Sequence, residues 1–471
     1  MSRVSLFERF STRSLLIAAI SSAFLLRILL LGHKSLWLDE ANSLRIATIG
    51  QADLWAGRSE QYHPPLFYAF VEWWSQFGQN EFFLRLPSAI LGTISVVLVF
   101  WLASELFSAE VAISALWLAA LSPLLIWYAQ EFRSYALLGA LGLGSILTTV
   151  ILLRGGGWRY WVLFVVSMLA ALYTHYSALL LILAQIALCA GLFATRRATR
   201  SGFLLWLAAW PLILLGYWPW LRTPPAATFL DLLLGDRSYV AMLLKSRLGI
   251  DYSQALVVGA IALAILLPAG FVLLHWLIRH YADALDRLRL RPSSQFVVAI
   301  LFVLLLLLEV IPLVYSLKRQ LSLFWPFVLI GFAWVWPWKR RHTRLLTAIL
   351  ILSALAALVN ILAIPKDQWR EAVTYLARQG RAGDLVVLQP GYMSIPYDYY
   401  DEGIIETIGV TTSASMDRIN SALDEQRRVW LVVHTKDVAD PNHTVEAWFA
   451  QNATRLRDRR FHNLLVTLYQ R

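Results

Sequence analysis

The sequence contains little charge and almost no cysteine. Only 15% of its 471 residues are charged, whereas 58% are hydrophobic. A water-soluble globule cannot bury so much apolar surface, and apolar runs of about 18 residues or more recur along the chain, which indicates a membrane protein. The single cysteine, Cys189, lies in one of these runs and has no partner for an internal disulfide. We expect it to pack as a small side chain.

Three further absences narrow the possibilities. No internal repeat is visible, although many transporter folds consist of repeated halves. The first apolar run has no small-residue cleavage site after it, so we expect a retained span and not a signal peptide. The net charge of +11 comes from short loops between apolar runs, so it indicates orientation in a membrane, and no nucleic-acid partner is expected.

Apolar segments dominate what is present. At about 20 apolar residues per span, the sequence predicts a polytopic α-helical membrane protein with about eleven transmembrane helices. Their predicted positions are 12–32, 87–106, 111–129, 135–153, 160–174, 177–194, 202–220, 255–278, 295–315, 323–338 and 345–363. The aromatic content of 13%, with 21 tryptophans, suits anchoring at the membrane interfaces.

Lysine and arginine concentrate in alternate loops, and this bias predicts the orientation. The positive-inside rule makes those loops and the amino terminus cytoplasmic. We therefore expect a multi-pass protein of the cell inner (plasma) membrane, with the loop 33–86, a second loop 221–254 and the segment 364–471 on the external, periplasmic side.

Two domains are predicted, a transmembrane domain over 1–363 and an external domain over 364–471. The second alternates β-rich runs, "GDLVVLQP", "RRVWLVVHT" and "NLLVTLYQR", with two helix-like stretches near 368–380 and 416–428. This alternation predicts a small α/β domain.

Chemically capable side chains gather at predicted span ends on the external side. They are Asp39, Glu40, His63, Gln130, Glu131, Arg133, His175, Tyr176, Lys318 and Arg319. A charge near hydrocarbon costs about 2.5–3.5 kcal/mol, so such residues usually mark functional sites. Their joint occurrence at one membrane depth describes a cavity with a polar floor.

Each candidate also has a purely structural interpretation. Asp39 and Glu40 would suit the amino-terminal cap of a helix, and Glu131 with Arg133 would suit a salt bridge between span ends. His63, which precedes Pro64 and Pro65, would suit the start of an interfacial helix. His175 is equally compatible with interfacial packing. The side chains of Lys318 and Arg319 could simply reach toward lipid headgroups.

A carboxylate that faces cations at a membrane surface suits transfer from a lipid-linked phosphate. The hydroxyl acceptor needs a general base, for which we select Asp39. The leaving phosphate needs cations more than a general acid, since Arg and Lys stabilise the charge that develops on it. One carboxylate acting alone predicts a single displacement with inversion, unlike a glycosidase with two carboxyl groups.

Four segments carry a family resemblance. "SLWLDEA", "HPPLFY", "YAQEFRSYALL" and "LYTHYSALLLILAQ", in this order, resemble the membrane glycosyltransferases of the GT-C fold. The sequence is most similar to bacterial proteins of the glycosyltransferase family 39 type, which includes protein O-mannosyltransferases and lipid A aminoarabinose transferases. The run "DQWREAVTYL…GDLVVL…YDYY" resembles the carboxy-terminal domain of bacterial members.

The resemblance implies roles for individual residues. Asp39 matches the catalytic base, with Glu40 beside it, and Glu131 with Arg133 matches positions that shape the donor site. Arg319 matches the arginine of a family element near the lipid phosphate, although Gln320 replaces the tyrosine that commonly follows it. Its neighbour Lys318 is a further candidate for binding the donor phosphate, because of its charge and position. His63, His175 and Tyr176 remain candidate substrate-binding residues.

The resemblance also implies the partners. The donor would be a polyprenyl-phosphate-linked sugar in the lipid bilayer, and the acceptor a glycan, lipid or protein. Some GT-C enzymes use a divalent cation and others do not. The sequence has no acidic metal cluster beyond Asp39, Glu40 and Glu131, so a divalent cation stays an open alternative and no metal site is assigned.

Two other functions compete with this interpretation. A transporter or flippase of lipid-linked sugars would share the polar cavity and the cations without needing a base, but it should carry polar residues deep in its spans. Only Arg27, Glu309 and Asn360 are obvious there. A non-catalytic assembly protein has no reason to keep acid, histidine and arginine on one face.

Overall fold

The structure is a computed structural model that describes most of the chain outside one long central segment. The described residues are 12–58, 63–194, 196–225, 315–335, 340–403, 405–410, 419–420, 428–435 and 443–470. The predicted span 255–278 lies outside these residues. The predicted span 295–315 does too, apart from its last residue, and so does most of the predicted loop 221–254.

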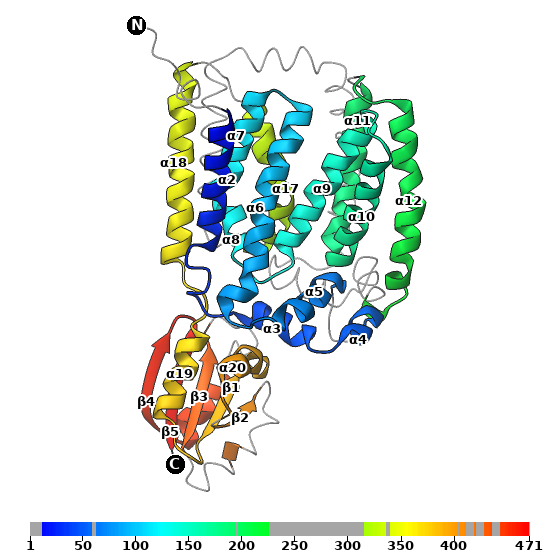
Figure 1. Cartoon of the computed structure of the whole chain (residues 1–471). Helices are drawn as coiled ribbons and strands as arrows, with labels where there is room; N and C mark the ends of the chain where they lie inside the picture. Colours follow the sequence, from blue (N-terminus) through cyan, green and yellow to red (C-terminus); the bar gives the residue numbers. More distant parts are fainter. Residues whose placement is uncertain are drawn as a thin grey trace, which may run out of the picture.

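Long helices form one bundle (Figure 1). They are α2 (Thr12–Ile28), α6 (Glu81–Leu106), α7 (Ala109–Ala120), α8 (Pro123–Ala129), α9 (Tyr135–Leu153), α10 (Trp158–Thr174), α11 (Leu179–Ala194), α12 (Arg200–Leu221), α17 (Tyr315–Val335) and α18 (Arg340–Ala363). Among the described residues, five helices are long and apolar enough to cross a membrane, or six if the bent pair α7–α8 is one span. A multi-pass membrane protein is therefore supported, while a total of eleven spans is not confirmed.

The predicted span 111–129 is broken into α7 and α8, which meet at an angle of 55°. Pro123 is the cause, since it occupies the first turn of α8 and the preceding Ser122 caps that helix by accepting a hydrogen bond from the backbone N–H of Leu125. The break leaves the last carbonyls of α7 without helical partners. Arg27 of α2, which is fully buried, donates to the carbonyl oxygens of Ala119 and Ala120 at 3.2 and 3.1 Å.

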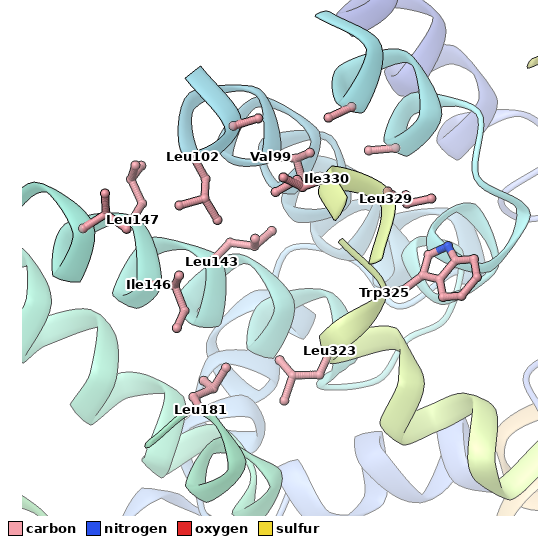
Figure 2. Packing of buried hydrophobic residues seen from close by; sticks show 14 of the residues in the cluster. Val99, Leu102, Leu143, Ile146, Leu147, Leu181, Leu323, Trp325, Leu329 and Ile330 are labelled. Carbon is pink, nitrogen blue, oxygen red and sulfur yellow. The ribbon is translucent and has the colours of Figure 1, made fainter. Parts of the chain in front are cut away.

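Helix α9 runs through the middle of the bundle core. Leu143, Ile146 and Leu147 on α9 face buried side chains of α6, α11 and α17 (Figure 2). Gly142 permits this convergence, because a Cβ atom there would lie 3.2 Å from both Leu181 and Leu323. Cys189 is buried as predicted.

The loop 33–86 folds into three short helices across one end of the bundle, α3 (Leu38–Ala47), α4 (Gln51–Ala56) and α5 (Leu66–Ser75) (Figure 1). A small apolar cluster supports them, with Leu36, Leu54, Phe67 and Val71 packed against Phe132 from the turn between α8 and α9. The described part of the loop, which we call the platform, is thus packed on the bundle and is not a solvated connection.

At the same end of the bundle lies a five-stranded sheet with the strand order β2-β1-β3-β5-β4 (Figure 1). The strands are β1 (Leu385–Gln389), β2 (Glu406–Gly409), β3 (Val429–His434), β4 (Thr454–Phe461) and β5 (Leu464–Gln470). Strand β1 pairs in parallel with β2 and β3, and β5 pairs antiparallel with β3 and β4. The helices of this region are α19 (Trp369–Gln379), α20 (Ser394–Tyr400) and α22 (Thr444–Asn452).

The carboxy-terminal α/β architecture is confirmed. The three predicted β-rich runs form β1, β3 and β5, and the stretch near 368–380 forms α19. Most of the second helix-like stretch, 416–428, lies outside the described residues. Strand β4 was not predicted, because "TRLRDRRF" is exposed at every residue except its last and carries no apolar alternation.

The platform and the sheet lie at one end of the bundle and the loop between α9 and α10 at the other. We therefore predict that Gly157→Cys and Glu402→Cys, each in a Cys189→Ala background, react with a membrane-impermeant maleimide from opposite sides. Both positions are exposed, and a side chain at Gly157 meets no atom within 4 Å. Labelling of both cysteines from the same side of sealed vesicles would contradict a bundle that crosses the membrane in this direction.

Candidate functional site

The first turn of α3 separates the two neighbouring acids. Trp37 caps the helix in an extended conformation, and its backbone N–H donates to the Glu40 carboxylate at 3.4 Å. Successive residues of a helix point about 100° apart, so Asp39 and Glu40 face different surroundings. Asp39 is half-exposed, whereas Glu40 is completely buried.

Glu40 is held by cations and by a backbone amide. Arg85 of α6 donates from Nε and Nη2 at 2.8 and 2.6 Å, and the N–H of Phe132 donates at 2.8 Å. The Lys366 Nζ lies 3.2 Å from the same carboxylate. Burial alone would raise the pKa of Glu40, but the charges of Arg85 and Lys366 together with these hydrogen bonds lower it to about 2. Glu40 is therefore a permanently charged anchor.

Arg85 also fixes the chain that leads into α3. Its guanidinium donates to the carbonyl oxygens of Leu31, Lys34 and Ser35 at 3.0, 2.7 and 2.9 Å. A single buried side chain thus joins α6, the end of the first helix and the acid of α3. A guanidinium suits this task because its five donors form a rigid planar fork.

Glu131 completes a buried group of four side chains, Glu40, Glu131, Arg85 and Lys366, which we call the Glu40 cluster. The Lys366 Nζ lies 3.8 Å from Glu131, which is 1% exposed. Burial lowers the pKa of Lys366, and Glu40 and Glu131 only partly offset this effect. Beside the cluster, Lys34 donates to the carbonyl oxygen of Asn360 at 2.9 Å. A cavity of about 10 Å³ between Lys34, Arg85 and Lys366 is too small for a sugar.

Arg133 supports the turn that carries Asp39. Its Nη1 donates to the Asp39 carbonyl oxygen at 2.9 Å and to the Ser43 hydroxyl at 2.7 Å. Its guanidinium also lies over the Tyr135 ring, 6.0 Å from the centroid. Burial disfavours the charge, but Tyr68 and Asp39 raise the pKa of Arg133, so the guanidinium stays protonated.

The histidines from two distant turns meet. The rings of His63 and His175 stack with centroids 4.5 Å apart, and Tyr176 lies 6.4 Å from His63. The backbone N–H of Ser177 donates to Nδ1 of His175 at 3.0 Å, so Nε2 carries the proton of the neutral ring. Tyr176 accepts a hydrogen bond from the Trp220 indole at 3.3 Å. The stack of His63 on His175 joins the platform to the turn between α10 and α11.

The structure brings together most of the predicted site. Asp39, Glu40, Glu131 and Arg133 meet at the start of α3, where Glu131 lies beside Lys366 and Arg133 donates to the Asp39 carbonyl oxygen. Lys318 and Arg319 belong to α17, not to a turn, and their side chains lie outside the described residues. Gln130 donates to the last carbonyl oxygens of the first helix, so it caps that helix.

Three cations of the site were not predicted, namely Lys34, Arg85 and Lys366. Arg85 carried a signal, since it is an ionisable residue near the start of an apolar run. Lys366 and Lys34 looked like ordinary loop lysines. No group of three or more His, Cys, Asp or Glu side chains is placed to hold a metal ion within the part of the chain that the structure describes.

The comparisons with known proteins bear on this site. Residues 62–222 match the family model described as dolichyl-phosphate-mannose-protein mannosyltransferase, a segment that includes the histidine pair, Arg85, Glu131 and Arg133. The resemblance to GT-C glycosyltransferases is confirmed. No curated protein matches the chain.

Solved structures resemble this chain at low sequence identity. The archaeal oligosaccharyltransferase AglB from Archaeoglobus fulgidus, in complex with an inhibitory peptide and a dolichol-phosphate, is 12% identical over 92% of this chain and 70% of its own, with a TM-score of 0.53. The same organism's oligosaccharyltransferase in complex with Zn and sulfate is 13% identical over 90% and 68%, with a TM-score of 0.51. ArnT from Cupriavidus metallidurans, bound to undecaprenyl phosphate, is 14% identical over 97% and 98%, with a TM-score of 0.48.

The two neighbouring acids should respond differently to removal of their charge. We predict that Glu40→Gln lowers the free energy of unfolding by about 3–5 kcal/mol, because Arg85 and Lys366 stay buried without their main counter-charge. Asp39→Asn should change it by less than about 1 kcal/mol, as is usual for substitutions away from buried networks. Thermal unfolding of both variants in one detergent measures the contrast, and equal effects would contradict the buried-anchor role of Glu40.

Proposed function

We propose that the protein is a membrane glycosyltransferase that moves a sugar from a polyprenyl-phosphate donor to a hydroxyl acceptor, with inversion and with Asp39 as the general base. The observation that carries the proposal is the difference in burial among the three acids of the site. Glu40 and Glu131 are buried beside cations, whereas Asp39 is half-exposed on a rigid turn. Among the three acids, Asp39 is the one that a substrate can approach.

The reaction needs one proton transfer and one displacement. The Asp39 carboxylate accepts the proton of the acceptor hydroxyl, and the hydroxyl oxygen attacks the anomeric carbon from the face opposite the phosphate. The bond from the anomeric carbon to the phosphate oxygen breaks, and polyprenyl phosphate leaves with the bonding electrons. Attack from the opposite face inverts the anomeric configuration, and a phosphate leaving group needs no general acid.

Cations are proposed to hold the departing phosphate. We assign this role to Arg133, Lys318 and Arg319, with Glu131 shaping the donor site. Arg133 has a second task, since its hydrogen bond to the Asp39 carbonyl oxygen fixes the base relative to the donor. AglB, which shares the fold, was solved with a dolichol-phosphate, and this supports a lipid phosphate as the donor class. The acceptor remains a glycan, a lipid or a protein.

The histidine pair is proposed to contact the substrate. The stacked rings of His63 and His175, with Tyr176 beside them, offer aromatic faces on which the apolar face of a sugar can pack. We place this site, the platform and the carboxy-terminal domain on the external face of the plasma membrane, following the distribution of lysine and arginine.

The base is tested by Asp39→Asn. The amide keeps the shape of the side chain but cannot accept the proton, so we expect turnover to fall by about 10²–10⁴-fold while donor binding persists. Release of polyprenyl phosphate from a panel of radiolabelled polyprenyl-phosphate sugars measures turnover. Asp53→Asn is the matched control, because Asp53 lies on the same platform in an exposed pair with Arg58.

The same experiment separates an enzyme from a flippase. A flippase needs no base, so Asp39→Asn would leave transport of the donor across vesicle membranes intact. The wild-type protein would also transfer no sugar to any acceptor. Wild-type turnover by Asp39→Asn would remove Asp39 from catalysis.

The phosphate site is tested by Arg133→Ala and Arg319→Ala. We expect both variants to bind a polyprenyl-phosphate donor more weakly and to turn over more slowly, because the same cations face the phosphate before and after it departs. Lys318→Ala should have a milder effect, since lysine offers a point charge in place of a planar fork. Donor binding at fixed detergent and salt is the measurement. Unchanged affinity in both arginine variants would place the phosphate elsewhere.

A further inference from the structure

The residues on either side of Asp39 are held by the carboxy-terminal region. Leu38 packs against the apolar cluster of the sheet, which includes Trp369, Val386 and Tyr397. Glu40 is paired with Lys366 from the segment that joins α18 to α19. The proposed base therefore sits between two side chains, both of which contact residues beyond position 363.

The first turn of α19 adds a second connection to the chain before α3. The Arg370 guanidinium forms an ion pair with Glu81 and donates to the carbonyl oxygens of Gly32 and His33, each at 3.2 Å. The neighbouring Glu371 accepts a hydrogen bond from the Ser35 hydroxyl at 3.0 Å. These contacts fix the chain from residue 32 to 35 against both α6 and α19.

Tyr400, at the end of α20, makes the third connection. Its hydroxyl accepts a hydrogen bond from the backbone N–H of Leu36 at 2.7 Å and donates to Glu81 at 2.8 Å. Leu36 lies 364 positions away in sequence and two residues before the start of α3. Burial raises the pKa of Tyr400 and the charge of Glu81 raises it further, so the phenol keeps the proton that it donates.

We propose that Lys366, Arg370 and Tyr400 are positioning residues, through which the carboxy-terminal domain fixes the Asp39 turn for catalysis. This inference rests on the proposed function. The three residues, called the latch below, come from the segment between α18 and α19, from α19 and from α20, and they reach Glu40, Glu81 and the backbone of residue 36. None of them needs to touch the substrate.

The latch acts on geometry and not on chemistry. A general base works only within hydrogen-bond reach of its proton, and a misplacement of about 1 Å can lower a rate about 10²-fold. Because the latch and the sheet form one connected unit, an acceptor that binds the sheet domain would act on the same contacts that fix Asp39. Arg133, the proposed donor contact, comes from the turn between α8 and α9, so we expect donor binding to change less than turnover when the latch is broken.

Three substitutions test the latch with little change in volume: Tyr400→Phe, Lys366→Met and Arg370→Met. We expect kcat to fall about 10-fold or more in Tyr400→Phe and Lys366→Met, with the donor KM within about 2-fold of wild type. We also expect faster amide hydrogen exchange over residues 38–47. Lys366→Arg and Arg370→Lys keep the charge and should recover most of the kcat that the methionine variants lose.

Arg428→Met is the matched control. It breaks a 2.6 Å ion pair with Asp384 inside the sheet domain, far in sequence from α3 and without contact to the latch. We expect it to lower the thermal stability of the sheet domain while kcat and the exchange over 38–47 stay at the wild-type values. If Arg428→Met instead lowers kcat and speeds the exchange over 38–47, general weakening of the domain explains the latch variants and the proposal is overturned.

Hydrogen exchange also separates this proposal from the proposed function. Wild-type exchange over 38–47 in both Tyr400→Phe and Lys366→Met would overturn the latch whatever the enzyme does. Faster exchange with unchanged kcat would overturn the positioning role as well. Wild-type turnover by Asp39→Asn would instead overturn the assignment of the base, and the exchange measurement would still report whether the latch holds α3.

Discussion

The buried ion pair between Glu40 and Arg85 is the interaction on which the site depends. Two charges removed from water carry a large desolvation penalty, and a buried pair is often no more stabilising than apolar side chains of the same volume. Its value here is geometric. Arg85 meets a carboxylate and three backbone carbonyls at once, so only one arrangement of the chain between residues 31 and 40 satisfies all of its donors.

The same pair explains why two adjacent acids differ. Glu40 is surrounded by donors and stays ionised, so it cannot exchange protons near neutral pH. Asp39 shares the helix turn but is only partly buried, and Arg133 donates a hydrogen bond to its backbone carbonyl oxygen. The proposed role of Asp39 as the base would draw on this support, because a general base must be held within hydrogen-bond reach of the proton that it accepts.

Sequence patterns predicted the elements better than their partners. Hydrophobic length located α6, α9, α12 and α18, and β-rich runs located three of the five strands. These signals are local, whereas the partners of buried charges are decided by the packing of distant elements. The sequence offered Arg133 as a partner for its neighbour Glu131, whereas the structure places Glu131 3.8 Å from Lys366, in the segment that joins α18 to α19. Pro123 is visible in the sequence, but the continuous apolar run around it led to the prediction of one span without a bend.

Arg27 has a consequence for how the chain enters the membrane. The Arg27 guanidinium donates hydrogen bonds to the carbonyl oxygens of Ala119 and Ala120, and these acceptors are absent until α7 has been synthesised. Without them, an arginine inside an apolar helix is strongly disfavoured in lipid. The last carbonyl oxygens of α2 likewise receive hydrogen bonds from Gln130, which is synthesised later still. Stable insertion of the first helix during synthesis therefore depends on residues made about a hundred positions later. Biogenesis of this protein should thus require α2, α6 and α7 to assemble as one unit, and not helix by helix.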